Sequence, residues 1–350
     1  MEKTYGTNRI SCRISIQLSD VQQSKKERKA MKKVKNICFL LLVLLGCIVI
    51  SGCQANDSDK EESVGDVEKK IVKSKTEDVT FESQRGTKIY GTIVTPAEMK
   101  NEDYPVVLFS HGFVGSRDGD GAFPKIAEKL AEENILSIMI DFAGNNDSKE
   151  PYTNYTVKNM SDDMDTALDY MKENYKIDED KIGLMGHSMG ARMTALKLDD
   201  QIKAAAIWAP AASPGLSGIY DFMGGKAFVE KYYKEAQEND FAVFDFYGEE
   251  NAIDLSLDFF EGVKESDPVK KINDYQGNLF IAVAEKDPAI QKATTDKAIR
   301  AATNVEELSV CRVKNADHGF KNIEDEKDTK VQAYTVERTA DFLTQKLYED

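Results

Sequence analysis

The stretch KIGLMGHSMGARMTALKL, residues 181–198, decides the fold of this chain. Its apolar start at 182–185 predicts a buried strand, and a run of helix formers follows the GHSMG sequence. This order of strand, sharp turn and helix puts Ser188 at the apex in a strained backbone conformation, with its hydroxyl lifted clear of the sheet. Gly186 and Gly190 are needed because side chains there would collide with the neighbouring strand and helix. The helix N-terminus directs N–H groups at any anion formed beside Ser188.

Apolar strands alternate with amphipathic helices through most of the chain. The predicted strands are 78–82, 88–95, 106–110, 135–140, 182–185, 204–208, 279–284 and 308–313. The predicted helices are 122–133, 160–175, 289–302 and 331–347. This alternation predicts an α/β fold with a mostly parallel sheet and helices on both faces. The first two strands flank an RGT sequence, which predicts an antiparallel hairpin at the N-terminal edge.

Residues 213–267 interrupt the alternation after the sixth strand. Eleven of the thirty Phe and Tyr residues of the chain fall between Pro210 and Pro268. The pattern predicts a helix at 225–239, and then a hairpin whose strands are 241–247 and 252–257. We interpret 213–267 as an inserted cap. Its aromatic side chains either form the cap's own small core or line an acyl or aryl pocket.

The charge of the chain is unevenly distributed. The net charge is −15, but residues 1–52 carry +7 and the remainder −22. So acidic a body is a poor partner for nucleic acid, and we interpret its charge as a solubilising surface.

The N-terminal sequence predicts export and lipid anchoring. A lysine-rich start precedes an apolar run at 37–50, and the sequence ISGC that ends at Cys53 resembles a bacterial lipobox. A second, weaker candidate is LLGC at 44–47. We therefore expect a leader and signal peptide at 1–52, with translation starting at Met1 or Met31, and a flexible tether at 53–75. The expected location is the extracytoplasmic face of the cell membrane. The alternative is a membrane anchor that is never cleaved. The apolar run of about fourteen residues is short for such an anchor, because a spanning helix needs ~20.

Five short sequences together resemble the α/β-hydrolase superfamily, and in particular the bacterial cinnamoyl/feruloyl esterases and their serine-aminopeptidase-like relatives. These sequences are SHGF at 110–113, DFAG at 141–144, GHSMG at 186–190, WAPAA at 208–212 and ADH at 316–318. Two positions depart from the family: Ala191 replaces a frequent second glycine, and GNNDS at 144–148 replaces G-x-G-x-S. The resemblance implies an α/β-hydrolase domain at 76–350 that contains the cap.

The resemblance also implies a Ser-His-Asp triad with Ser188 as the nucleophile. A serine hydroxyl needs a base within hydrogen-bond reach, and the chain has three histidines. His187 lies inside the elbow, where we expect its side chain to point away from Ser188, and His111 begins a loop that resembles the family's oxyanion loop. His318, directly after the last predicted strand, is therefore the expected base.

The family places its triad aspartate after the preceding strand, where this chain has Asp287, with Glu285 as the alternative. Pro288 is a suitable first residue for the helix that follows. Two backbone N–H groups are expected to stabilise the oxyanion, those of Met189 and Phe113.

These features predict a lipid-anchored serine hydrolase that cleaves small-molecule carboxylic esters through an acyl-enzyme. The mechanism requires no metal and no organic cofactor. One alternative is a peptidase or amidase with the same triad, although the sequence shows no anchor for a substrate amine or carboxylate. The other is a non-catalytic binding lipoprotein on the same scaffold, which would be expected to lack a member of the triad.

Overall fold

A computed structural model describes residues 74–245, 252–325 and 327–349 of the chain. The predicted signal sequence, Cys53 and the greater part of the predicted tether lie outside these residues. Among the helices that the structure describes, none combines the length and apolar character needed to cross a bilayer.

The described residues contain an eight-stranded sheet with the order β1-β2-β4-β3-β5-β6-β9-β10. Its strands are β1 Ser74–Glu82, β2 Lys88–Pro96, β3 Tyr104–Ser110, β4 Leu136–Asp141, β5 Ile177–His187, β6 Ile202–Trp208, β9 Asn278–Ala284 and β10 Glu307–Val313. β1 and β2 form the predicted antiparallel hairpin, β2 is antiparallel to β4, and the other neighbours are parallel. The prediction of a mostly parallel sheet is confirmed.

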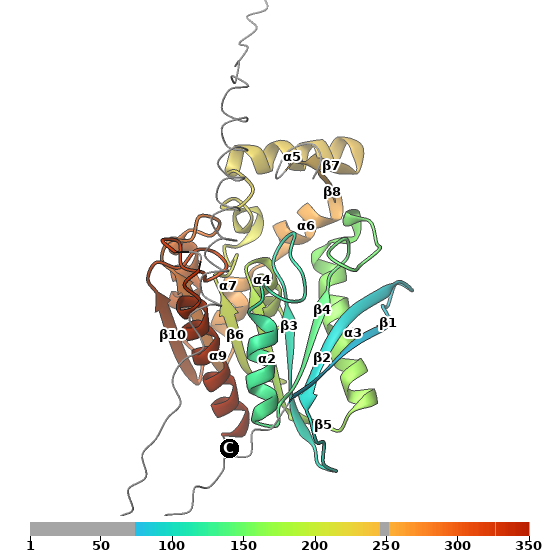
Figure 1. Cartoon of the computed structure of the whole chain (residues 1–350). Helices are drawn as coiled ribbons and strands as arrows, with labels where there is room; N and C mark the ends of the chain where they lie inside the picture. Colours follow the sequence, from blue (N-terminus) through green and yellow to red (C-terminus); the bar gives the residue numbers. More distant parts are fainter. Residues whose placement is uncertain (1–73, 246–251, 326, 350) are drawn as a thin grey trace, which may run out of the picture. The chain divides into compact units, whose positions relative to one another are not determined.

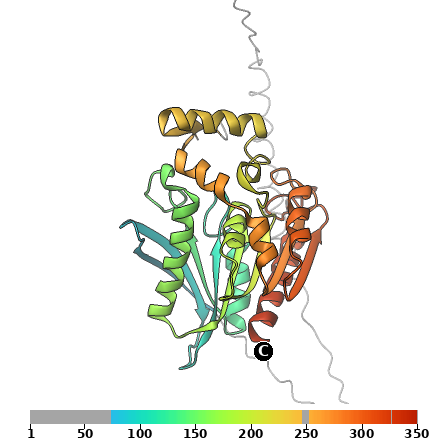
Figure 2. The same ribbon diagram turned by 180° about the vertical axis from the view of Figure 1, so that it is seen from behind.

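Helices cover both faces of this sheet, as predicted (Figures 1 and 2). α2 Phe123–Glu132 and α9 Lys330–Tyr348 pack on one face. The other face carries α3 Val157–Asn174, α4 Met189–Leu196, α7 Pro268–Asp274 and α8 Lys292–Ala301. Strands β3, β4 and β9 are buried along their whole length because apolar side chains from both faces of the sheet enter the two cores.

The segment between β6 and α7 lies at one end of the sheet (Figure 1). It contains η2 Gly215–Gly218, α5 Lys226–Asn239, strands β7 Phe241–Phe244 and β8 Ile253–Ser256, and α6 Leu257–Glu265. The predicted helix is confirmed, and β7 and β8 pair as the predicted antiparallel hairpin. Two aromatic residues of the segment between β6 and α7, Phe246 and Tyr247, lie outside the described residues. The second predicted strand ends one residue early because the Ser256 hydroxyl accepts a hydrogen bond from Phe259 N and so begins α6.

Candidate active site

The turn between β5 and α4 holds Ser188 in a backbone conformation that is unusual for a residue with a side chain. Its φ is 59° and its ψ is −118°. A β carbon at Gly190 would lie 2.0 Å from the carbonyl oxygen of Ser110, and one at Gly186 would lie 2.4 Å from Oγ1 of Thr194. The collisions predicted for both glycines are confirmed. Close backbone packing therefore stabilises the strained turn that presents Ser188.

His318 and Asp287 meet beyond the carboxyl ends of the last two strands. Nδ1 of His318 lies 2.7 Å from Oδ2 of Asp287. The other oxygen of Asp287 accepts hydrogen bonds from Ala289 N at 2.7 Å and Ile290 N at 2.8 Å. Since Nδ1 of His318 donates to the carboxylate, Nε2 is the nitrogen left for proton transfer.

One local expectation about this region is wrong, that for Pro288. Pro288 is not the first residue of a helix: α8 begins at Lys292, because the N–H groups after Pro288 turn back to Asp287 instead of entering a helix. Asp317, the other carboxylate near His318, accepts a hydrogen bond from Lys321 N at 2.8 Å. The carboxylate that the structure brings to Nδ1 is that of Asp287.

Ser188 and His318 line one cavity of about 570 Å³. The loop at 110–113 forms another part of its wall and approaches the nucleophile closely: a β carbon at Gly112 would lie 3.1 Å from Cβ of Ser188. This loop follows β3 directly, and Phe113 lines the same cavity as Ser188. The assignment of the Phe113 and Met189 N–H groups to an oxyanion hole stays a prediction.

His111 supports the loop that contains Phe113. Its ring is buried, and its Nε2 accepts a hydrogen bond from Phe142 N at 3.0 Å. Its Nδ1 lies 2.7 Å from Gly112 O and therefore carries the proton. Burial lowers the pKa of His111, which favours this neutral form. Both ring nitrogens of His111 are thus used to fix the loop.

The ring of His187 packs against the ring of His318. His187 lines the same cavity as Ser188, and its ring centre lies 4.6 Å from that of His318. Its Nε2 donates to the His318 carbonyl oxygen at 2.8 Å. Burial, and to a smaller extent the charge of His318, lowers the pKa of His187 to about 4. A neutral imidazole therefore packs against the loop that holds His318, a contact that no local pattern in the sequence reveals.

Aromatic residues of the insertion pack in a core, and among the described residues one of them also reaches the cavity. The Phe113 ring lies within 6.2 Å of the ring centres of Tyr152, Tyr155, Phe222, Phe244 and Phe259. Phe244, Phe259 and Phe260 are buried and belong to the core. Phe222 is half-buried and lines the cavity. The insertion therefore has an aromatic core that continues onto Phe113, and of its described residues Phe222 contributes a ring to the cavity wall.

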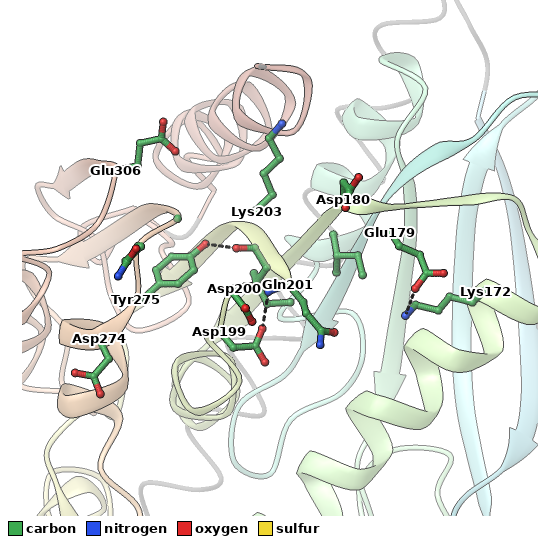
Figure 3. A pocket seen from close by; sticks show the side chains of 14 residues that line it. Lys172, Glu179, Asp180, Asp199, Asp200, Gln201, Lys203, Asp274, Tyr275 and Glu306 are labelled. Atoms are coloured by element: carbon green, nitrogen blue, oxygen red, sulfur yellow. Dashed lines mark hydrogen bonds and ion pairs between the residues drawn. The ribbon is translucent and has the colours of Figure 1, made fainter.

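A larger cavity, of about 890 Å³, lies near the amino ends of β5, β6 and β9 (Figure 3). Its carboxylates belong to Glu179, Asp180, Asp199, Asp200, Asp274 and Glu306. Among the described residues that line it there is no serine, cysteine or histidine. In open α/β sheets ligands bind beyond the carboxyl ends of the strands. The smaller cavity, with Ser188 and His318, is therefore the candidate active site. Nor do the described parts of the chain contain a group of three or more His, Cys, Asp and Glu side chains arranged to hold a metal ion.

Comparison with known families identifies the class of protein. The sequence model described as the alpha/beta hydrolase fold matches residues 105–244, and that of the dienelactone hydrolase family matches residues 222–347. The chain therefore has the α/β-hydrolase fold, and the two models together span residues 105–347. No curated protein is close enough in sequence to be matched to it.

Solved structures with this fold include several esterases. Est1E from Butyrivibrio proteoclasticus, solved with ferulic acid bound, has a TM-score of 0.62 and 16% identity, covering 77% of this chain and all of that one. The esterase domain of a Rhodothermus marinus protein has a TM-score of 0.55 and 16% identity, with 78% and 99% covered. An esterase from Pyrococcus furiosus has a TM-score of 0.55 and 18% identity, with 82% and 97% covered. At such low identity these likenesses establish the fold.

Proposed function

We propose that this protein is a serine hydrolase that cleaves carboxylic esters, with Ser188 as nucleophile, His318 as base and Asp287 as its orienting acid. One observation carries the proposal: His318 is hydrogen-bonded to Asp287 at 2.7 Å and lines the same cavity as the strained Ser188. Asp287 fixes the tautomer of His318 so that Nε2 accepts the proton of the Ser188 hydroxyl. The esterases among the structures with the same fold support this reaction class.

In the first half of the reaction, Oγ of Ser188 attacks the ester carbonyl carbon and its proton passes to Nε2 of His318. The tetrahedral oxyanion accepts hydrogen bonds from the N–H groups of Met189 and Phe113. When the oxyanion collapses, the bond to the alcohol oxygen breaks, and His318 gives its proton to the departing alkoxide. In the second half, His318 takes a proton from water, the hydroxide attacks the acyl-enzyme, and Ser188 regains its proton as the acid leaves.

The predicted membrane anchor forms part of the proposal. It rests on the ISGC sequence that ends at Cys53, which lies outside the described residues. A diacylated cysteine would give stable anchoring, since one lipid chain binds membranes only marginally. Cys53→Ala should release the protein from the membrane fraction or leave it as an uncleaved precursor. Recovery of the wild type as a soluble protein without lipid would refute the anchor.

Amide cleavage is the second candidate function, and one observation favours it. Asp120 lines the cavity and places a carboxylate there, which a substrate amine would require as an anchor. This carboxylate is exposed and lies 3.6 Å from Nζ of Lys321. The interaction energy of an exposed ion pair is small, so a cationic substrate group can compete with Lys321 for Asp120.

A panel of matched substrates separates the two functions. The wild type should hydrolyse short nitrophenyl esters and methyl ferulate, and Ser188→Ala should remove this turnover. Amides with the same acyl groups and a free amine should be poor substrates. Faster cleavage of these amides, reduced by Asp120→Asn, would replace the esterase assignment by the peptidase one. No turnover of either class by the wild type would refute both.

A further inference from the structure

Arg192 is a buried cation in the helix that begins directly after the nucleophile. Its relative exposure is 0%, and within the described residues its hydrogen bonds run to backbone carbonyls and one hydroxyl rather than to a carboxylate. Burial lowers the pKa of its guanidinium to about 10, so it stays charged at neutral pH. A buried charge destabilises a fold unless hydrogen bonds satisfy it. Nη1 and Nη2 of Arg192 have such partners, whereas its Nε is buried without a hydrogen-bond partner among the described residues.

These partners lie at both ends of the insertion. Nη1 donates to Ala211 O at 2.7 Å and to Ser213 O at 2.8 Å, where the insertion begins. Nη2 donates to Val263 O at 3.2 Å, to Ser266 O at 3.2 Å and to Ser266 Oγ at 2.7 Å, where it ends. The guanidinium group of arginine is planar, so Nη1 can donate to the carbonyls at the start of the insertion while Nη2 donates to those at its end. The ammonium group of lysine is a compact point charge and cannot present its donors in this geometry.

Backbone hydrogen bonds connect the residues just before the insertion, and the helix that carries Arg192, to the nucleophile. The carbonyl oxygen of Ser188 accepts hydrogen bonds from Arg192 N at 3.1 Å and from Ala211 N at 3.2 Å. A β carbon at Gly218 would lie 2.0 Å from Nη1 of Arg192, so the chain also packs closely around the guanidinium. Phe222, the ring that the insertion contributes to the cavity, follows four residues after Gly218. The position of the Phe222 ring is therefore linked to the Arg192 guanidinium through the short segment 218–222.

We propose that Arg192 is a positioning residue that fixes both ends of the insertion to the nucleophile helix and thereby sets the position of Phe222 at the cavity wall. Arg192 is not among the described residues that line the cavity. It determines which acyl or aryl groups fit beside Ser188, because the wall that would contact them is held by its hydrogen bonds. This inference deepens the proposed ester hydrolysis and rests on it for its effect on substrate preference.

The test compares Arg192→Met with Arg85→Met, an equivalent change at a different arginine. Arg85 bonds to Glu150 and Asp163, which do not line the cavity. In Arg192→Met, amide hydrogen exchange near residues 211–222 and 259–267 should become faster by roughly tenfold to a hundredfold, because several charge-assisted hydrogen bonds are lost. KM for aryl esters should rise more than KM for short aliphatic esters. Arg192→Lys should give an intermediate result, and Arg85→Met should change neither readout in the insertion.

The outcomes separate a failed inference from a failed function. If Arg192→Met only lowers thermal stability, with unchanged exchange in the insertion and an unchanged order of ester preference, Arg192 is an ordinary core residue and the inference is wrong. Should this variant not fold, Ser266→Ala removes one acceptor at 2.7 Å and should speed exchange at the second end alone; unchanged exchange there would also overturn the inference. Absence of Ser188-dependent turnover in the wild type would refute the proposed function instead. In that case, amide hydrogen exchange in the insertion would still test whether Arg192 positions it.

Discussion

The elbow at 186–190 and the inserted segment at 213–267 differ in what holds them. The elbow depends on close backbone packing, and its glycines leave no room for a side chain. The insertion depends on aromatic side chains that pack on one another and on Phe113, and of its described residues Phe222 alone lines the cavity. Under the proposed function, the chemistry needs a few residues at strand ends, whereas substrate preference depends on the inserted segment, which has a core of its own. Substitutions in the two regions should therefore have different effects.

The largest effect is expected at the acid. Asp287→Asn should lower kcat by about 10⁴-fold, because an amide at this position favours the wrong tautomer of His318. Steady-state kinetics on a nitrophenyl ester measures this loss, and circular dichroism should show an unchanged fold. Glu285→Gln, two residues earlier, is the matched control and should keep near wild-type rates. The opposite pattern would mean that Glu285 is the acid of the triad.

In the insertion core, a truncation should affect stability and leave the chemistry intact. Phe259 is fully buried and packs against Phe113 and Phe260. Phe259→Ala should lower the free energy of unfolding by about 3–5 kcal/mol, as large cavities in a packed core do. Denaturant titration measures this change. The order of ester preference should stay that of the wild type; a reordered preference with full stability would place Phe259 in the substrate pocket.

At the cavity wall, the same kind of truncation should affect binding. Phe222→Ala should raise KM for aryl esters by roughly tenfold to 200-fold and leave kcat nearly unchanged, because a contact made equally in the ground and transition states is lost. Stability should change less than in Phe259→Ala, since Phe222 is only half-buried. An unchanged KM across the ester panel would show that the insertion does not contribute to substrate recognition.

The smallest expected effect concerns His187 and pH. Burial lowers its pKa from 6.5 to about 4, so the unfolded chain binds its proton at a higher pH than the folded one. The resulting stability is complete above about pH 6.5 and is lost as the pH falls toward 4. His111 acts in the same direction, while burial raises the pKa of Asp163 to about 6 and so opposes the loss.

His187→Gln keeps a donor for the His318 carbonyl and removes the titration. Its melting temperature should therefore fall less than that of the wild type between pH 7 and pH 4. Parallel melting curves across this range measure the difference. Identical slopes for the two proteins would show that His187 does not titrate as its burial requires.

The sequence predicted the sheet well because its signals are local. Strands β3, β4 and β9 are short apolar runs buried on both faces, and the turn chemistry around Ser188 lies within five residues. Helix α6 was missed because its apolar start follows β8 directly, and a short apolar run does not by itself distinguish a strand from a helix. The hydrogen bond between His318 and Asp287 joins two predicted residues, and their catalytic roles stay predictions.

The contacts of Arg192 and His187 lay beyond prediction for a different reason. They join residues far apart in the chain: Arg192 reaches Ser266, and His187 reaches His318. A local sign did exist for Arg192, since MGARMTAL places a single charge in an otherwise apolar helix. Such a helix buries the charge, but the sequence does not show which carbonyls satisfy it.

The most direct test of the central claim is labelling of the nucleophile with a fluorophosphonate, followed by mass mapping of the modified residue. The wild type should carry one label, on Ser188, and Ser188→Ala should carry none. His318→Ala should label far more slowly, because the hydroxyl then lacks its base. A label on another residue, or labelling of His318→Ala at the wild-type rate, would contradict the account of Ser188 and His318 as nucleophile and base.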